Sequence, residues 1–84
     1  MKKLENLKKK IIYRSSYRGT KEMDLLLSAF VKYYIESLSI NDLLELEKFL
    51  NFEDEVIGDF YFKNKISKDL ERNRFSSLFK KFKF

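Results

Sequence analysis

Apolar residues recur along this chain at the spacing of an α-helix. The clearest series starts at Met23 and follows the i, i+3, i+4, i+7 pattern that places side chains on one face of a helix. The series consists of Met23, Leu26, Leu27, Phe30, Tyr34 and Leu38. No segment of strand length alternates convincingly between apolar and polar residues, and the chain contains no proline. The sequence therefore predicts an all-α fold, a small bundle of about five short helices.

Two helices are expected in the first half of the chain. The first should run from about Lys3 to Ser15, and the second from about Lys21 to Ser37. Gly19 lies between them and is expected to be a cap residue with a positive φ angle. Thr20 follows it and carries a hydroxyl of the kind that an N-cap position prefers.

Two more helices are expected in the middle of the chain. Ser39, with Asp42 three positions later, matches a variant of the capping box and should begin a third helix that ends near Leu50. Asp54 is expected to be the N-cap of a short fourth helix, which Asn64 ends.

The fifth helix is expected after Ser67, which should be its N-cap. Its apolar stripe consists of Phe75, Leu78, Phe79 and Phe82. Because this segment is basic as well as amphipathic, contact with a membrane surface is an alternative to packing in the core. We favour core packing.

Length and composition exclude many kinds of site. At 84 residues the chain should form one domain, which is too small to enclose a cofactor pocket of its own. It has no cysteine and no histidine, which excludes disulfides, thiolate chemistry and the usual zinc sites. We therefore predict no catalytic residue, no metal and no cofactor bound by this chain.

No apolar run approaches the roughly 20 residues that cross a bilayer. The basic N-terminal segment also lacks the uninterrupted apolar core of a signal peptide. We expect a cytoplasmic protein with no stable membrane insertion.

Charge divides the single domain 1–84 into three parts. Residues 1–21 hold eight Lys/Arg and one Glu, residues 22–62 hold two Lys and ten Asp/Glu, and residues 63–84 hold eight Lys/Arg and two acids. The basic N-terminal helix and the basic, aromatic C-terminal segment can therefore pack against the acidic middle. Alternatively, two faces of opposite sign can meet a partner.

The most compact polar cluster is Arg-Gly-Thr-Lys-Glu at positions 18–22. The simplest interpretation of its charges is solvation, or an intramolecular pair between Arg18 and Glu22. The alternative is an interface, because Arg14 and Arg18 lie beside tyrosines, and arginine and tyrosine are enriched where proteins bind partners. Gly19 fits both interpretations, either as a turn residue or as a position that a partner can approach closely.

The carboxylates near this cluster have ordinary explanations. Glu22 and Asp24 fall in the first turn of the second helix, where the helix dipole favours acids. Neither has a nucleophile nearby in the sequence, so acid–base catalysis has no support. The acidic run Glu53–Glu55 is interpreted as a cap and a solvated turn.

The stretch RSSYRGTKEMDLLLSAF, with its RGxxEMDLLLxxF pattern, resembles the SdhE family of flavin-assembly factors, in a form similar to that of its alphaproteobacterial branch. The resemblance runs from about Lys10 to Tyr61. It implies a helper, not an enzyme, that binds the flavoprotein subunit of succinate dehydrogenase, or the related fumarate reductase subunit. The helper promotes covalent attachment of FAD, which the partner holds.

The resemblance also implies the residues that bind the partner. They are Arg14, Tyr17, Arg18, Gly19, Thr20, Glu22 and Asp24. We expect the free protein to be a monomer and to bind no nucleic acid. The alternative function is a small helix-turn-helix protein that binds nucleic acid with its second and third helices, although the acidic middle segment disfavours it.

Overall fold

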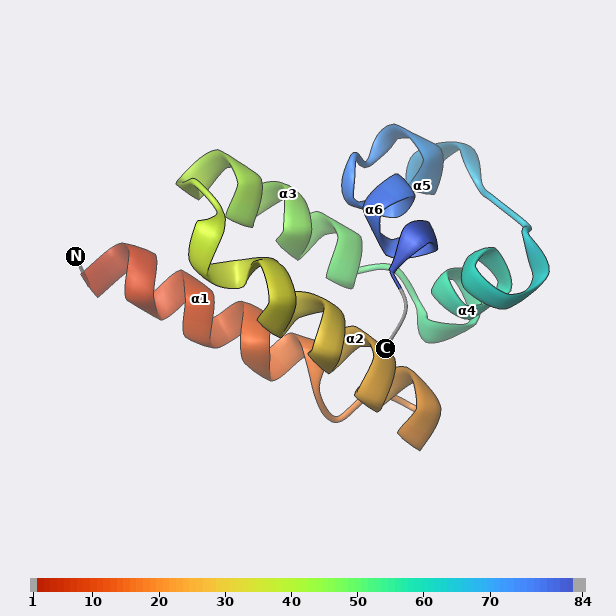
Figure 1. Cartoon of the computed structure of the whole chain (residues 1–84), viewed down its shortest axis with the longest axis horizontal. Helices are drawn as coiled ribbons and strands as arrows, with labels where there is room; N and C mark the ends of the chain where they lie inside the picture. Colours follow the sequence, from red (N-terminus) through yellow and green to blue (C-terminus); the bar gives the residue numbers. More distant parts are fainter. Residues whose placement is uncertain (1, 83–84) are drawn as a thin grey trace.

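The computed structural model describes residues 2–82, in which six α-helices and one 3-10 helix form and no strand occurs (Figure 1). The elements are α1 (Lys2–Ser15), α2 (Lys21–Tyr34), η1 (Ile35–Ser37), α3 (Ile40–Leu50), α4 (Asp54–Lys63), α5 (Lys68–Arg72) and α6 (Phe75–Lys81). The all-α prediction is confirmed. The first four predicted helices agree with the structure to within one or two residues, with η1 continuing α2 to Ser37.

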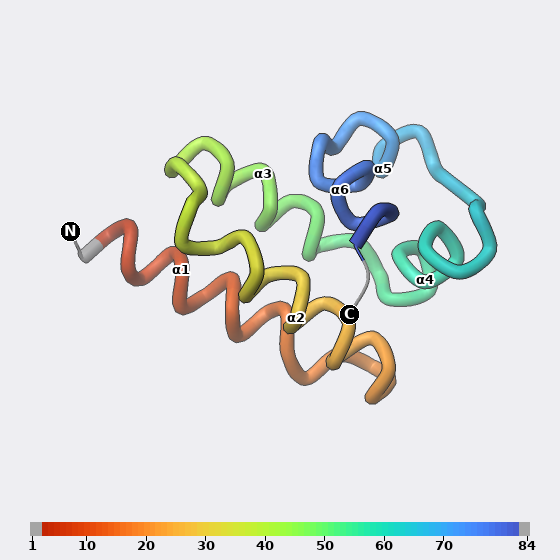
Figure 2. Tube along the Cα trace, in the orientation of Figure 1, coloured from red at the N-terminus to blue at the C-terminus, as the bar shows by residue number. Residues whose placement is uncertain are grey.

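The helices form two groups that share one core. α1, α2 and α3 lie together at one end, with α1 in contact with both of the others (Figure 1). α6 packs against α3, α4 and α5 and so joins the second group to the first. Figure 2 shows the stretch 64–67 passing along the outer edge of the molecule between α4 and α5.

Phe30 lies at the centre of the core. Its ring is fully buried and meets the rings of Phe49, Phe75 and Phe79 at centroid distances of 6.1, 6.5 and 5.1 Å. Two of these contacts are edge-to-face, the arrangement that aromatic pairs prefer. The predicted stripe of α2 is confirmed, because its first four members are buried and its last two pack against the core.

Side chains predicted to cap helices do so at three positions. The Ser67 hydroxyl accepts a hydrogen bond from the Leu70 N–H at 3.2 Å and begins α5. The Thr20 hydroxyl accepts a hydrogen bond from the Met23 N–H at 3.1 Å and begins α2. Ser39 and Asp42 form both bonds of a capping box at the start of α3. Each cap satisfies N–H groups that a helix start leaves unpaired.

The predicted fifth helix is wrong in one respect, because the structure divides it into α5 and α6 at Asn73. Asn73 is 6% exposed, and its side-chain amide donates to the Glu45 carbonyl oxygen while its oxygen accepts from the Phe75 N–H. The side chain thus replaces helical backbone bonds and starts a new helix. Leu78 was expected in the apolar stripe but is exposed, whereas Phe75 and Phe79 on the same helix are buried.

Replacing Asn73 with alanine should lower the free energy of unfolding by about 1–3 kcal/mol. The substitution leaves the buried Phe75 N–H without its acceptor and removes the bond to the part-buried Glu45 carbonyl oxygen. Chemical denaturation followed by circular dichroism measures the change, and Asn41→Ala on the exposed face of α3 is the control. A loss below about 0.5 kcal/mol would contradict this role of Asn73.

The basic ends pack against the acidic middle, as one interpretation of the charge pattern predicts. Lys10 of α1 lies 2.8 Å from Glu47 of α3, and Lys8 lies 3.3 Å from Glu36. Arg74 forms an ion pair with Asp42 from the other end of the chain. Each pair is partly exposed and contributes little stability alone.

No helix in the described part of the chain is long and apolar enough to cross a membrane.

Candidate functional site

The turn between α1 and α2 contains an unusual backbone conformation at Tyr17. Its φ angle is 57°, in the left-handed region that side chains larger than asparagine rarely adopt. Gly19 does not have a positive φ angle, so the prediction that it is a left-handed cap residue is wrong. Left-handed geometry costs a residue with a Cβ atom about 1–2 kcal/mol, and other contacts must offset that cost.

Contacts from α2 stabilise this turn. The Tyr17 N–H donates to a carboxylate oxygen of Asp24 at 3.2 Å, and the Ser28 hydroxyl donates to the Ser15 carbonyl oxygen at 3.2 Å. The hydroxyl oxygens of Ser16 and Ser28 also lie within hydrogen-bond distance of each other, at 3.2 Å. Asp24 therefore has a second role beyond the first-turn acid that the sequence suggested, because it fixes the backbone at Tyr17.

Arg18 forms the densest set of contacts in this region. Its side chain is 12% exposed, and its Nε donates to Oδ1 of Asp54 at 2.6 Å. The two terminal nitrogens donate to three backbone carbonyl oxygens, of Arg14 (2.8 Å), Leu50 (3.0 Å) and Phe52 (3.1 Å). The prediction of a pair between Arg18 and Glu22 is not realised, since Asp54 occupies that role.

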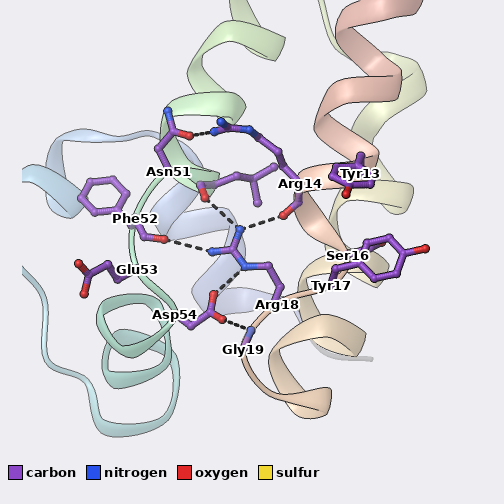
Figure 3. A pocket seen from close by; sticks show the side chains of 11 residues that line it. Tyr13, Arg14, Ser16, Tyr17, Arg18, Gly19, Asn51, Phe52, Glu53 and Asp54 are labelled. Atoms are coloured by element: carbon purple, nitrogen blue, oxygen red, sulfur yellow. Dashed lines mark hydrogen bonds and ion pairs between the residues drawn. The ribbon is translucent and has the colours of Figure 1, made fainter.

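Three helix ends meet at this guanidinium group (Figure 3). Arg14 and Leu50 lie at the C-terminal ends of α1 and α3, where exposed carbonyl oxygens carry partial negative charge. Asp54 is the first residue of α4, where the helix dipole favours an anion. The positive and negative side chains therefore each match the helix ends that surround them.

The sequence predicted that Asp54 is the N-cap of α4, and this prediction is wrong. Glu53 occupies that position without a side-chain cap bond. The Asp54 carboxylate instead points towards the α1–α2 turn, where Oδ2 accepts from the Gly19 N–H while Oδ1 accepts from Arg18. A Cβ atom added to Gly19 would lie 3.0 Å from Oδ2 of Asp54, so the close approach of this carboxylate explains the glycine.

A groove of about 660 Å³ lies beside this cluster, between the α1–α2 turn and the loop that joins α3 to α4. It is lined by Tyr13, Arg14, Ser16, Tyr17, Arg18, Gly19, Leu50, Asn51, Phe52, Glu53 and Asp54. Figure 3 shows the Tyr17 ring pointing away from the Arg18 guanidinium group. The rings of Tyr13 and Tyr17 are 5.4 Å apart and 68% and 80% exposed, so they form an aromatic pair that is open to a partner.

The structure brings together most of the predicted partner-binding residues at the turn between α1 and α2. Arg14, Tyr17, Arg18 and Gly19 line the groove. Thr20 and Asp24 lie next to it and shape its turn through hydrogen bonds. Glu22 is exposed in the first turn of α2 and does not line the groove.

Sequence reasoning missed the other wall of the groove, the loop from Leu50 to Asp54. Asn51 accepts a hydrogen bond from Arg14 through its side chain, and Phe52 and Asp54 contact Arg18. These contacts join residues more than 30 positions apart. The charge pattern was the one available indication, because it predicted that the basic N-terminal segment packs against the acidic middle of the chain.

The groove is lined by polar and aromatic groups. It offers arginine donors, exposed phenol rings and carboxylates, and none of these is arranged as a nucleophile with an adjacent base. Within residues 2–82, no group of three or more acidic side chains is placed to hold a metal ion.

A family described as "Flavinator of succinate dehydrogenase" matches residues 9–83. The chain belongs to this family. The match includes the whole groove and all seven predicted partner-binding residues. The assembly-factor resemblance of the RGxxE stretch is thereby confirmed at the level of the succinate dehydrogenase flavinator family.

Three relatives of this chain are each named "Succinate dehydrogenase assembly factor 2, mitochondrial". The protein of Meyerozyma guilliermondii is 41% identical over 58 residues, which are 69% of this chain and 41% of the relative. That of Lodderomyces elongisporus is 40% identical over 53 residues (63% and 30%), and that of Komagataella phaffii 36% over 55 residues (66% and 27%). The chain thus spans between about a quarter and two fifths of the length of these relatives.

Proposed function

We propose that this chain binds the flavoprotein subunit of succinate dehydrogenase and promotes covalent attachment of FAD to that subunit. Membership of the flavinator family supports a role of this chain in flavin attachment. The observation that carries the proposal is the exposed Tyr13–Tyr17 pair on one wall of the groove. Rigid aromatic residues next to arginine are typical of the centre of a protein interface.

The backbone at Tyr17 adds support. A left-handed conformation at a residue with a large side chain costs stability, and such strain is concentrated at functional positions. Here the conformation directs the ring into solvent, where it contributes nothing to the core. A binding role for Tyr17 accounts for a feature that folding alone does not require.

In this proposal the chain is a helper and the partner forms the flavin bond. It binds one arrangement of the flavoprotein more tightly than the others and so raises the population of that arrangement. FAD stays with the flavoprotein throughout. The hydrogen bonds that hold the turn between α1 and α2 suit this role, because a preorganised surface loses little conformational entropy on binding.

Tyr17→Asn should reduce covalent flavin in a co-expressed flavoprotein by at least about tenfold while leaving this chain folded. Asparagine tolerates the left-handed conformation. The free energy of unfolding should therefore fall by no more than about 1 kcal/mol, and an increase is also consistent with this expectation. The aromatic anchor, however, is lost. In-gel fluorescence of the flavoprotein measures covalent flavin, and chemical denaturation of the purified variant measures stability.

Tyr33→Gln is the matched control, since Tyr33 is also an exposed tyrosine (72%) but lies outside the groove. It should support flavin attachment as the wild-type chain does. Equal attachment with and without the wild-type chain, with soluble flavoprotein and added FAD, would refute the proposed function. Equal attachment with Tyr17→Asn and wild type would refute the role of the tyrosine pair.

A further inference from the structure

We infer that Arg18 is a positioning residue, and that it acts by holding the loop from Leu50 to Asp54 as the second half of the partner-binding surface. This inference rests on the proposed function and deepens it. It divides the groove into residues that contact the flavoprotein and residues that shape the groove. Asp54 belongs with Arg18 in the second class, although neither composition nor motif indicated it.

The hydrogen bonds of Arg18 leave it little capacity for a partner. A guanidinium group has five N–H donors, and four hydrogen bonds to groups of this chain engage it. Its side chain is 12% exposed, and that of its partner Asp54 is 24% exposed. One N–H donor therefore remains for a partner, and the ion pair with Asp54 already neutralises the charge.

The contacts of Arg18 instead determine where the loop lies. Two of its acceptors are the carbonyl oxygens of Leu50 and Phe52, and a third is the side chain of Asp54. Asp54 completes the link, because its second oxygen accepts from the Gly19 N–H on the opposite wall. The two walls of the groove are therefore joined by one ion pair and its hydrogen bonds.

The loop held in this way presents groups that a partner can reach. Glu53 is exposed and lines the groove, and its side chain does not cap α4. Asn51 is exposed and accepts a bond from Arg14. With the tyrosine pair on the facing wall, Glu53 gives the groove an acidic edge, which fits a segment of the flavoprotein that carries a donor such as lysine or arginine.

The test measures the affinity of purified variants for the cognate flavoprotein subunit by isothermal titration calorimetry. Asp54→Asn keeps the shape of the side chain, and Arg18→Lys keeps the positive charge while losing the planar fork. We expect each to weaken binding by at least about tenfold. The double variant should bind about as weakly as either single one, since both substitutions break the same link.

A second readout separates positioning from general loss of stability. In the NMR spectrum, Asp54→Asn should shift the Gly19 amide resonance and increase its hydrogen exchange, while the resonances of Phe30 and other core residues stay in place. Glu53→Gln, as a contact residue, should weaken binding and leave the Gly19 amide unchanged. Glu55→Gln, an exposed first-turn acid that does not line the groove, is the control and should bind as wild type does.

The outcomes separate this inference from the proposed function. If the wild-type chain does not bind the flavoprotein, the proposed function and the inference both fail. If it binds and Asp54→Asn or Arg18→Lys binds equally well, the positioning role is wrong and the proposed function stands. Additive losses in the double variant would show that Arg18 contacts the partner by itself and would also overturn the inference.

Discussion

Phe30→Ala should lower the free energy of unfolding by about 3–5 kcal/mol, the loss typical of a buried phenylalanine. The Phe30 ring contacts aromatic rings from α3 and α6, and it is fully buried. Its removal opens a cavity where the two groups of helices join. Since a small domain is stable by only about 5–15 kcal/mol, the variant should unfold at a much lower denaturant concentration. Urea denaturation followed by far-UV circular dichroism measures this loss.

Phe62→Ala is the matched control for Phe30→Ala. Phe62 lies on α4, is 51% exposed, and contacts the neighbouring Tyr61 ring. Its truncation should cost less than about 1 kcal/mol, as surface substitutions usually do. Equal losses for the two variants would show that the aromatic core does not hold the helices together as described.

Arg18→Ala should lower the free energy of unfolding by about 3 kcal/mol. The substitution leaves the Asp54 carboxylate without its counter-charge, and three carbonyl oxygens lose their donor. Hydrogen bonds to a charged group are each worth about 1.5–3 kcal/mol. The expected loss is smaller than the sum of these bond energies, because water reaches the partly exposed site and replaces some of the lost hydrogen bonds. Thermal and urea denaturation give two independent measurements.

Arg14→Ala is the control for Arg18→Ala, because both remove an arginine from the same groove. The Arg14 side chain is exposed and forms a hydrogen bond with the side chain of Asn51. Its loss should cost about 0–1 kcal/mol. A similar loss for both variants would mean that charge in this region, and not the particular contacts of Arg18, determines stability.

Local signals were sufficient to predict most of the fold. The spacing of Met23, Leu26, Leu27 and Phe30 identified the buried face of α2, and hydroxyls at Thr20 and Ser39 identified two helix starts. The break at Asn73 was missed because its cause is not local. A carbonyl oxygen at Glu45, far away in the sequence, accepts the bond that makes a buried asparagine favourable there.

The candidate site was predicted on one side and missed on the other. The RGxxE stretch predicted partner-binding residues at the turn between α1 and α2, and the groove lies beside that turn. The explanation of Gly19 was wrong, because Tyr17 has the positive φ angle and Gly19 accommodates a carboxylate. A side chain brought in from Asp54 cannot be read from the residues next to Gly19, so only the tertiary structure supplies the reason.

The position of α6 has a consequence for how this chain is made. Phe75 and Phe79 cover Phe30 and Phe49, yet the cell synthesises them long after α2 and α3. While the ribosome adds the intervening residues, the largest aromatic faces of the emerging chain have no permanent cover. The contacts of α6 with Phe30 and Phe49 can therefore form only after α6 has left the exit tunnel, and until then those rings lack that cover.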